Sequence, residues 1–284
     1  MDLTSPKTIK EICAKFNFRF SKGLGQNFLL DGSVLDKIVE AAQPKDGVLE
    51  IGPGFGVLTG RLAESAEKVV SVEIDKKLIP VLEYTLSEYD NVKIVEKDIL
   101  KTDLHKLIDE EFGGQKISVA ANLPYYITTP IITALIEERL PIKNIVVMVQ
   151  KEVAERICAA PGKKDYGAIS VLCQYYTEPE LVATVPAGSF IPPPKVDSAV
   201  LKLKLREKPA AEPADEKYFF KVVKAAFAQR RKTLVNCLAN GLGIDKNTAA
   251  KAITDCGISP DIRGERLSVQ EFAYLSDKLS GKEI

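Results

Sequence analysis

Three glycines at alternate positions stand where a short apolar run gives way to an amphipathic stretch. Residues 48–59 read VLEIGPGFGVLT and contain Gly52, Gly54 and Gly56. A strand can turn at once into a helix beneath a ligand only if the backbone reaches positive φ angles and no Cβ blocks the approach, and glycine meets both conditions. The pattern therefore predicts a strand, a tight loop that contacts a flat polar ligand, and a helix.

The spacing of these glycines separates two classes of cofactor loop. The dinucleotide fingerprint is G-x-G-x-x-G with an acid about 20 residues later. Val57 stands where that fingerprint needs its third glycine, which disfavours a nicotinamide-dependent dehydrogenase. The spacing G-x-G-x-G resembles the S-adenosylmethionine loop of Rossmann-like methyltransferases. The apolar run 69–72 ends at Glu73, whose carboxylate could accept hydrogen bonds from both hydroxyls of a ribose. The alternative is an ordinary glycine turn beside a surface acid.

Two further polar residues follow predicted strands. Asp98 comes just after the segment 92–96 and could accept a hydrogen bond from an adenine amino group, although an acid at this place could also cap a helix. In α/β sheets, ligands bind beyond the carboxyl ends of the parallel strands. We therefore expect one site lined by the residues that follow four successive strands, namely Gly52, Glu73, Asp98 and Asn122.

The tetrapeptide Asn122-Leu123-Pro124-Tyr125 suits methyl transfer to an exocyclic adenine nitrogen. That nitrogen is a poor nucleophile because its lone pair is delocalised into the ring. Acceptors for its two hydrogens, the Asn122 side-chain oxygen and a backbone carbonyl held by the rigid Leu-Pro turn, would favour a pyramidal nitrogen. Tyr125 offers a face for stacking on the base and for a cation–π contact with a sulfonium. The structural alternative is a simple Asn-x-Pro turn at a strand end.

The elements that must position these residues alternate between strand and helix. Strands are expected at 48–51, 68–73, 92–96, 117–121 and 144–149, and helices at 8–16, 33–42 (with Ser33 as N-cap), 57–65, 76–88, 103–112, 130–138, 151–160 and 168–176. This alternation predicts an α/β fold, a Rossmann-like and mostly parallel sheet with helices on both faces. The segments 181–185 and 198–205, separated by a triple proline, are expected to form an antiparallel pair at the sheet edge.

A change of composition predicts two domains. Residues 207–215 are rich in Pro, Ala and Glu and are interpreted as a linker between a catalytic domain at 1–206 and a small all-helical domain at 216–284. Helices are expected there at 216–240, 245–256 and 269–279. Asp245 and Ser268 are their expected N-caps, and Gly241 and Gly257 are the expected stops.

The composition leaves little material for metal, triad or histidine chemistry. Five scattered cysteines form no C-x-x-C pair, and His105, the one histidine, lies in a charged stretch. No apolar run approaches the roughly 20 residues of a membrane span. We therefore expect a cytoplasmic monomer without metal or membrane contact.

The charges are unevenly distributed although the formal net charge is zero. Basic residues gather near the N-terminus and in the acid-free stretch 217–240, whereas acids concentrate between Glu64 and Glu111. Such a run is often only a solvated face, but two of them beside a cofactor domain predict a phosphate-binding surface.

Five features resemble the ribosomal RNA adenine dimethyltransferase family, in order and over nearly the whole chain. They are Q-N-F-L at 26–29, E-I-G-P-G-F-G at 50–56, the acids Glu73 and Asp98, N-L-P-Y at 122–125, and F-I-P-P-P-K-V-D-S at 190–198. The stretch A-F-A-Q-R-R-K-T-L at 226–234, expected to be helical, is similar to the branch that dimethylates two adjacent adenosines in the 3′-terminal hairpin of small-subunit (16S) rRNA. It favours that branch over the Erm resistance methylases of large-subunit rRNA.

The resemblance implies specific roles. S-adenosylmethionine would contact Gln26, Asn27, Leu29, Glu50, Gly52, Gly54, Gly56, Glu73, Asp98 and Asn122, with Glu73 at the ribose and Asp98 at the adenine. Phe190, otherwise a core aromatic before a proline turn, would stack on the flipped-out target base opposite Tyr125. The RNA backbone would contact the helical domain and Lys22, Lys163, Lys164, Arg230, Arg231 and Lys232. The implied partner is a precursor of the small ribosomal subunit.

One other function remains open. The protein could be a ribosome-assembly or RNA-binding factor in which methylation is incidental. A DNA adenine methyltransferase is disfavoured, because such enzymes usually carry Asp/Asn-Pro-Pro-Tyr and a domain that reads the duplex.

Overall fold

The computed structural model describes residues 1–281, apart from the side chain of Lys22. The chain forms two compact units, one made of residues 1–154 and 180–205, the other of residues 155–179 and those from 206 onward. One boundary therefore lies beside the predicted one at 206. The segment 155–179, which the predicted division assigns to the catalytic domain, belongs instead to the helical unit.

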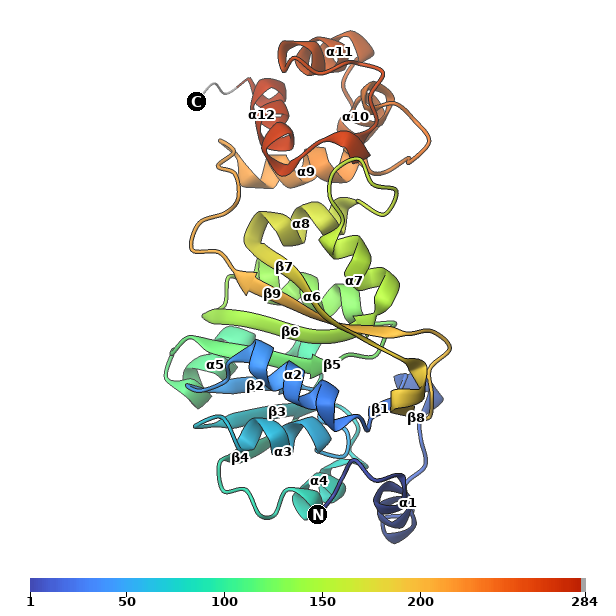
Figure 1. Ribbon diagram of the computed structural model, residues 1–284. Helices are drawn as coiled ribbons and strands as arrows, with labels where there is room; N and C mark the ends of the chain where they lie inside the picture. The colour runs from blue at the N-terminus through green and yellow to red at the C-terminus, as the bar shows by residue number, and fades with distance from the viewer. Residues whose placement is uncertain (282–284) are drawn as a thin grey trace. The chain divides into compact units, whose positions relative to one another are not determined.

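The first unit is built on a mixed sheet with the strand order β4-β3-β2-β5-β6-β9-β7 (Figure 1). The strands are β2 (Val48–Ile51), β3 (Val69–Glu73), β4 (Val92–Glu96), β5 (Ile117–Asn122), β6 (Ile142–Gln150), β7 (Thr177–Val185) and β9 (Ser198–Leu205). The first five pair in parallel, and β9 runs antiparallel to β6. The predicted class of fold, a mostly parallel sheet with an antiparallel edge, is confirmed.

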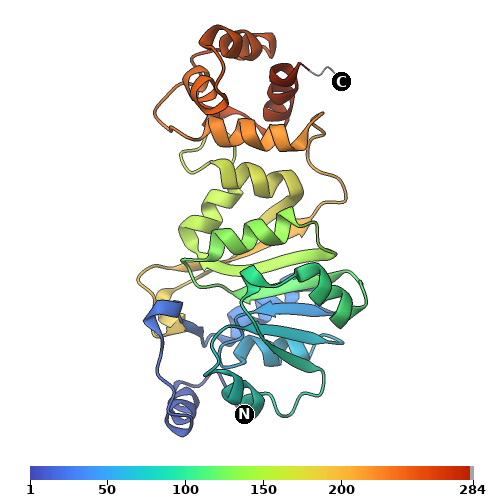
Figure 2. The ribbon, with the colours of Figure 1, turned by 180° about the vertical axis from the view of Figure 1, so that it is seen from behind.

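Helices cover both faces of this sheet, which is why its central strands β2, β3 and β5 are buried along almost their whole length. The helices α2 (Gly32–Ala42) and α3 (Val57–Ala63) lie in front of the sheet in Figure 1, and α5 (Leu104–Phe112) and α6 (Thr128–Glu137) lie in front of it when it is seen from behind in Figure 2. The short helix α4 (Ile79–Thr85) precedes β4. This alternation follows from right-handed crossovers between parallel strands.

The N-cap of α2 lies two residues earlier than predicted. Asp31, not Ser33, is the N-cap, because the Asp31 carboxylate accepts a hydrogen bond from the backbone nitrogen of Ser33 at 3.0 Å. Either residue type can cap a helix. The sequence at 31–33 offers both, so its composition alone could not choose between them.

The segment before the sheet contains the helix expected at 8–16 and two elements that the sequence did not indicate. It comprises α1 (Pro6–Lys15), the 3-10 turn η1 (Lys22–Leu24) and a two-residue strand β1 (Phe28–Leu29). β1 pairs antiparallel with β8 (Phe190–Ile191), which follows the 3-10 turn η3 (Ala187–Ser189). Residues 22–29 are rich in glycine and polar side chains, yet they contain a 3-10 turn and a strand. The strand depends on a partner far along the chain, which no local pattern can reveal.

The second unit is helical around an aromatic core. It contains the second half of α7 (Lys151–Cys158) and the whole of α8 (Ala168–Tyr176), α9 (Glu216–Ala226), α10 (Leu234–Leu242), α11 (Lys246–Asp255), the 3-10 turn η4 (Gly264–Arg266) and α12 (Val269–Ser280). The rings of Tyr175 and Phe219 stack with centroids 4.9 Å apart. This packing of α8 on α9 explains why the segment 155–179 belongs to the helical unit. None of the helices among residues 1–281 is long and apolar enough to cross a membrane.

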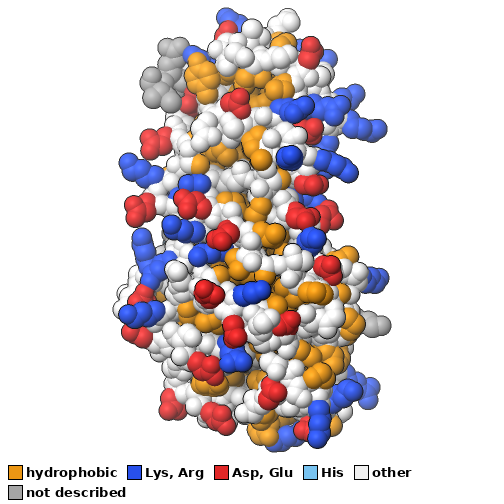
Figure 3. Space-filling model, viewed as in Figure 1, with side chains coloured by type: hydrophobic (Ala, Val, Ile, Leu, Met, Phe, Trp, Pro, Cys, Tyr) orange, Lys and Arg blue, Asp and Glu red, His pale blue; other side chains and the backbone are white. Residues whose placement is uncertain are grey.

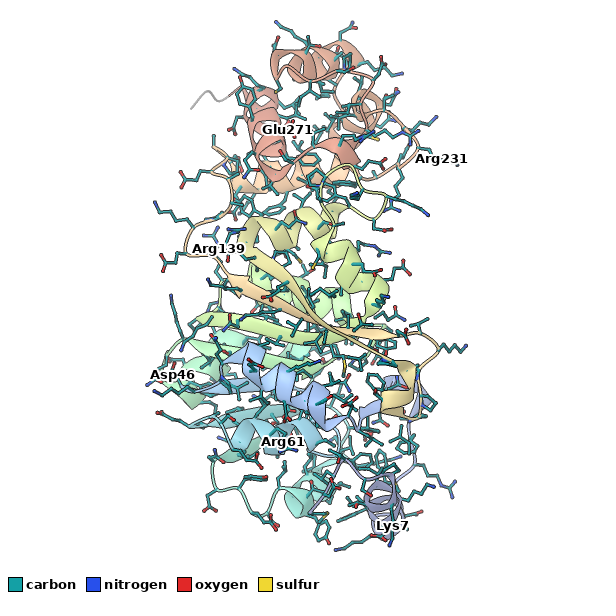
Figure 4. The ribbon with its side chains drawn as sticks, in the orientation of Figure 1. Lys7, Asp46, Arg61, Arg139, Arg231 and Glu271 are labelled. Carbon is teal, nitrogen blue, oxygen red and sulfur yellow. The ribbon has the colours of Figure 1, made fainter. Side chains whose placement is uncertain are left out.

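The predicted helix 216–240 is wrong, because the chain forms two helices with a turn at 227–233. Gly241 does not end a helix but lies inside α10, where a Cβ would come within 2.5 Å of the Ala225 Cβ. The glycine therefore permits close packing of α10 against α9. Asp245 and Ser268 are N-caps as predicted, and Ser268 forms a capping box with Glu271, which Figure 4 labels on α12.

Candidate active site

A cavity opens at the carboxyl edge of the parallel strands in the first unit. Most of the predicted site residues line it: Gln26, Asn27, Leu29, Glu50, Gly52, Gly54, Glu73, Asp98, Asn122, Leu123, Pro124 and Tyr125. Two predicted residues, Gly56 and Phe190, are not among its lining residues. The convergence expected from the strand ends is therefore present in the fold.

The glycine loop has the backbone geometry that its sequence indicates. Gly52 and Gly54 have φ angles of +70° and +61°. A Cβ on Gly52 would meet nothing within 4 Å, so this position faces open space, whereas a Cβ on Gly54 would lie 2.6 Å from Cε1 of Phe28. Gly52 thus leaves room for a ligand, and Gly54 allows the ring of Phe28 to pack against the loop. Gly56 begins α3 as its N-cap.

One hydrogen bond ties Asn122 to the loop before α2, and a second holds that loop in shape. The Asn122 amide nitrogen donates to the backbone carbonyl of Asn27 at 2.8 Å, and the Asn27 amide nitrogen donates to the carbonyl of Gly25 at 3.1 Å. Because the amide nitrogen of Asn122 is engaged, its side-chain oxygen is directed away from Asn27 as an acceptor. Gln26 holds the same loop, since its side chain donates to Asp75 Oδ2 at 2.9 Å and accepts from the Ser21 nitrogen at 2.8 Å.

Two buried carboxylates lie on neighbouring strands at the base of the cavity. Glu50, only 1% exposed, accepts hydrogen bonds from the hydroxyls of Thr59 and Ser71, each at 2.7 Å. Burial, with a smaller contribution from the charge of Glu73, raises the pKa of Glu50 to about 7, although the two hydrogen bonds oppose this rise. Glu73 is 4% exposed and accepts from the Asp75 nitrogen at 2.8 Å, and burial raises its pKa as well.

Asp98 caps a short turn and also lines the cavity. Its carboxylate accepts from the Leu100 nitrogen at 3.1 Å, which caps the 3-10 turn η2 (Ile99–Lys101), and lies 3.3 Å from the Lys101 ammonium. The same residue lines the cavity. Capping fixes the direction of the side chain without removing it from the cavity wall.

The two aromatic residues expected to flank a base lie in different surroundings. The Tyr125 hydroxyl is 2.6 Å from the Ser198 hydroxyl, and burial raises the pKa of the Tyr125 phenol. Phe190 is 4% exposed and belongs to the core cluster that includes Leu29, its partner in the β1–β8 pair. The Phe190 ring therefore packs in the core and not beside the Tyr125 ring in the cavity.

Sequence reasoning missed several cavity residues. Ile74 and Ile99 each directly follow a predicted acid, and Tyr126 directly follows the N-L-P-Y motif. Their position next to the recognised residues was the signal that could have identified them. Among residues 1–281, no group of three or more His, Cys, Asp or Glu side chains could hold a metal ion.

The basic residues of the second unit lie in two loops that the fold brings together. Lys163 and Lys164 precede α8, and Arg230, Arg231 and Lys232 lie in the turn between α9 and α10, not in a helix as predicted. The Arg230 guanidinium donates to the Lys164 carbonyl at 3.4 Å. Arg231 projects outward from its loop in Figure 4, and Figure 3 shows Lys and Arg side chains gathered around that part of the unit. Lys22 has no described side chain.

Comparisons with known proteins identify relatives over almost the whole chain. A family model described as ribosomal RNA adenine dimethylase matches residues 3–280. The ribosomal RNA small subunit methyltransferase A of Bacillus cytotoxicus is 53% identical over 284 residues, which cover 98% of this chain and 97% of that protein. The protein of the same name from Bacillus mycoides is 51% identical with the same coverage.

Two solved structures share the architecture. The dimethyladenosine transferase of Plasmodium falciparum matches with a TM-score of 0.72 and 28% identity, over 87% of this chain and 95% of that one. The 23S rRNA methyltransferase ErmE matches with a TM-score of 0.69 and 27% identity, over 89% of this chain and 99% of that one.

The buried Glu50 predicts a pH dependence of stability. Its pKa is about 7 in the folded protein but about 4.3 in an unfolded chain. Between these values the folded protein holds a proton that the unfolded chain has lost, so the contribution to stability is full below about pH 4 and is lost as the pH rises through about 7. We expect the melting temperature of the cofactor-free protein to fall from about pH 5 to about pH 8, and the fall to be smaller in Glu50→Gln.

The exposed Glu40 on α2 provides the control, because Glu40→Gln should retain the wild-type pH profile. A residual slope from Glu73 is expected in Glu50→Gln. Identical profiles for the wild type and Glu50→Gln would contradict the assignment of the proton to Glu50.

Proposed function

The chain belongs to the ribosomal RNA adenine dimethylase family, and on that premise we propose that it methylates small-subunit rRNA. In the proposed reaction, methyl groups pass from S-adenosylmethionine to the N6 amines of two adjacent adenosines in the 3′-terminal hairpin of 16S rRNA. The 53% identical relative, named a small subunit methyltransferase, supports this choice of RNA. The observation that carries the chemistry is the hydrogen bond from the Asn122 side-chain nitrogen to the Asn27 carbonyl. This bond leaves the Asn122 side-chain oxygen able to accept a hydrogen bond from a substrate.

The cavity residues fit S-adenosylmethionine, which supplies an electrophilic methyl group on a sulfonium. The open position at Gly52 leaves room for the methionine part. Glu73 offers a carboxylate to the ribose hydroxyls and Asp98 one to the adenine amine. Ile74, half exposed at 51% although apolar, and Ile99 provide surfaces for a flat ring beside those carboxylates. The rest of the proposed cofactor wall is formed by Gln26, Asn27, Leu29, Glu50 and Gly54. Gly56 ends the glycine loop as the N-cap of α3.

Asn122 and the turn after it would position the target amine. The Asn122 side-chain oxygen would accept one amine hydrogen. The Pro124 carbonyl already accepts from the Ile127 nitrogen at 3.1 Å and the Thr128 hydroxyl at 3.2 Å, so the Leu123 carbonyl is the second acceptor that we propose. Two acceptors would orient the nitrogen lone pair toward the methyl group.

No side chain needs to remove a proton before methyl transfer, because the amine proton becomes acidic only after the new bond has formed. His105 is exposed and hydrogen-bonded to the Glu138 carbonyl at 2.8 Å, and it does not line the cavity. Tyr125, fixed by Ser198, would stack on the target base. The half-buried position supports this role, since a ring held at its hydroxyl has little conformational freedom to lose on binding.

The basic loops of the helical unit would hold the RNA backbone, with Lys22 as a further proposed contact. Lysine and arginine in loops can follow a phosphate chain, and phosphate contacts position RNA without reading its sequence. The proposed partner is a small-subunit precursor bound by one copy of the chain, and this substrate would place the activity in the cytoplasm.

One experiment tests the proposed function. The protein is incubated with labelled S-adenosylmethionine and, separately, with unmethylated small subunits, large-subunit RNA and duplex DNA, and the digested nucleic acid is analysed for N6,N6-dimethyladenosine. We expect dimethyladenosine only from small subunits. Product only from large-subunit RNA or DNA would overturn the choice of substrate, and tight binding of small subunits without any product would favour an assembly factor.

Asn122→Ala should lower kcat by about 100-fold or more, because the lost oxygen acts on the amine during the reaction. Binding of small subunits should change little. Glu73→Ala is the matched cavity variant, and it should instead weaken the binding of S-adenosylmethionine about tenfold or more, as expected for a lost bond to a charged group. If Asn122→Ala lost RNA binding in parallel with activity, the proposed role of Asn122 in positioning the amine would be refuted. An unchanged Kd for S-adenosylmethionine in Glu73→Ala would refute the proposed contact of Glu73 with the ribose.

Phe190 could stack on the target base only after its ring leaves the core, and we propose that RNA binding draws it out. The β1–β8 pair that holds it is only two residues long on each strand, so few backbone hydrogen bonds oppose the movement. Phe190→Leu keeps the core filled but removes the aromatic face, and it should lower kcat/KM about tenfold at an unchanged melting temperature. Wild-type activity in this variant would leave Phe190 as a core residue alone.

Replacing Arg230 and Arg231 with Ala should reduce the slope of log Kd for small subunits against log salt concentration by about 1 to 2, because each phosphate contact contributes nearly one unit. Lys45→Ala with Lys116→Ala is the charge-matched control. Both lysines are exposed, and they precede β2 and β5 at the amino edge of the sheet, where Figure 4 labels Asp46. If both double variants shift the slope equally, the loop arginines have no special contact with RNA.

A further inference from the structure

Tyr126 is an exposed aromatic residue at the rim of the cavity, and the proposed chemistry makes no use of it. Its side chain is 62% exposed, more than that of any other aromatic residue among the described residues. It lines the same cavity as Asn122 and directly follows Tyr125. Exposure of a large ring to water is unfavourable, so an aromatic side chain that remains exposed beside a binding cavity points to a ligand that covers it.

The ring of Tyr126 is supported on one side by the protein. Gly25 lies under it, because a Cβ on Gly25 would be 3.3 Å from Tyr126 Cδ1 and 3.4 Å from Cε1. The φ angle of Gly25 is +60°, so the backbone conformation also favours glycine at this position. Among the described residues, no ring, cation or hydrogen-bond partner engages the Tyr126 side chain. The ring therefore has a supported side and a side open to solvent.

The loop that contacts Tyr126 also holds the Asn122 side chain. The Gly25 carbonyl accepts from the Asn27 side chain, and the Asn27 carbonyl accepts from Asn122. Two hydrogen bonds thus connect Gly25, which contacts the Tyr126 ring, to the Asn122 side chain, so the positions of the ring and of Asn122 are linked. Such an arrangement suits two neighbouring parts of a single ligand.

We propose that the Tyr126 ring is a stacking platform for the nucleobase next to the adenosine that is being methylated. This inference rests on the proposed function. Extraction of one base into the cavity leaves its neighbour unstacked on one side, and an exposed aromatic ring at the cavity rim replaces that lost partner. Where two adjacent adenosines are substrates, the base on Tyr126 is the other adenosine of the pair.

Stacking on a tyrosine accepts any base but favours the larger purines, because a purine covers more of the ring. Tyr126 is therefore a positioning residue with a preference for a purine neighbour. Its hydroxyl has no part in this role, so phenylalanine should replace it. Leucine, which is apolar but not flat, should not.

The test uses small subunits in which one adenosine of the pair is replaced by guanosine or by uridine, so that a single target remains beside a strongly or a weakly stacking neighbour. The wild type should show a lower KM for the guanosine substrate, by about tenfold. Tyr126→Leu should lose most of that difference, and Tyr126→Phe should retain it. Comparing one enzyme on two substrates cancels any effect of the substitution on folding.

Two controls separate this role from others. The Kd of S-adenosylmethionine should be unchanged in Tyr126→Leu, and a weakened Kd would make the ring part of the cofactor wall and overturn the platform. Tyr84→Leu removes another exposed tyrosine, one that packs beside Lys15 away from the cavity, and should keep the purine preference.

The outcomes also distinguish the two proposals. If the wild type methylates no small subunits, the proposed function fails and this inference falls with it. If the wild type methylates both substrates and Tyr126→Leu discriminates between guanosine and uridine as the wild type does, the proposed function stands and the platform is refuted.

Discussion

The hydrogen bond from the Asn122 side chain to the Asn27 carbonyl is the contact on which the candidate site depends. It joins the carboxyl end of a central strand to a loop that precedes the whole sheet in sequence. The loop is held in turn by Gln26 on Asp75 and by the packing of Phe28 against Gly54. These contacts therefore connect one wall of the cavity, the glycine loop and the Asn122 side chain.

The base of the cavity combines burial with acidity. Glu50 and Glu73 lie on adjacent parallel strands, and both are almost fully buried, so burial raises the pKa of each carboxylate and the charge of Glu73 adds to the rise at Glu50. The hydroxyls of Thr59 and Ser71 donate hydrogen bonds to the Glu50 carboxylate, which offset part of the cost of burying it but add no opposite charge. A cationic sulfonium cofactor would be favoured in such surroundings, which agrees with the methyl donor that we propose.

The fold does not by itself choose the RNA. A dimethyladenosine transferase and a 23S rRNA methyltransferase match this chain with similar TM-scores of 0.72 and 0.69 at 28% and 27% identity. The preference for small-subunit RNA rests instead on relatives with about half of their residues identical. Differences in target are expected in surface loops, such as the basic turn between α9 and α10, because loops vary while the sheet that carries the cofactor site is kept.

The sequence alone determined the sheet, the glycine loop and the strand-end residues, because hydrophobic period, glycine spacing and the position of acids after apolar runs are local properties. The strands 48–51, 92–96 and 198–205 have the bounds that these patterns predict. Only the tertiary structure decided the rest, since each remaining feature depends on contacts between distant segments. The pairing of β1 with β8 buries Phe190, and the packing of Tyr175 on Phe219 places residues 155–179 in the helical unit. The contact of Gly25 with Tyr126 places an exposed ring at the cavity rim.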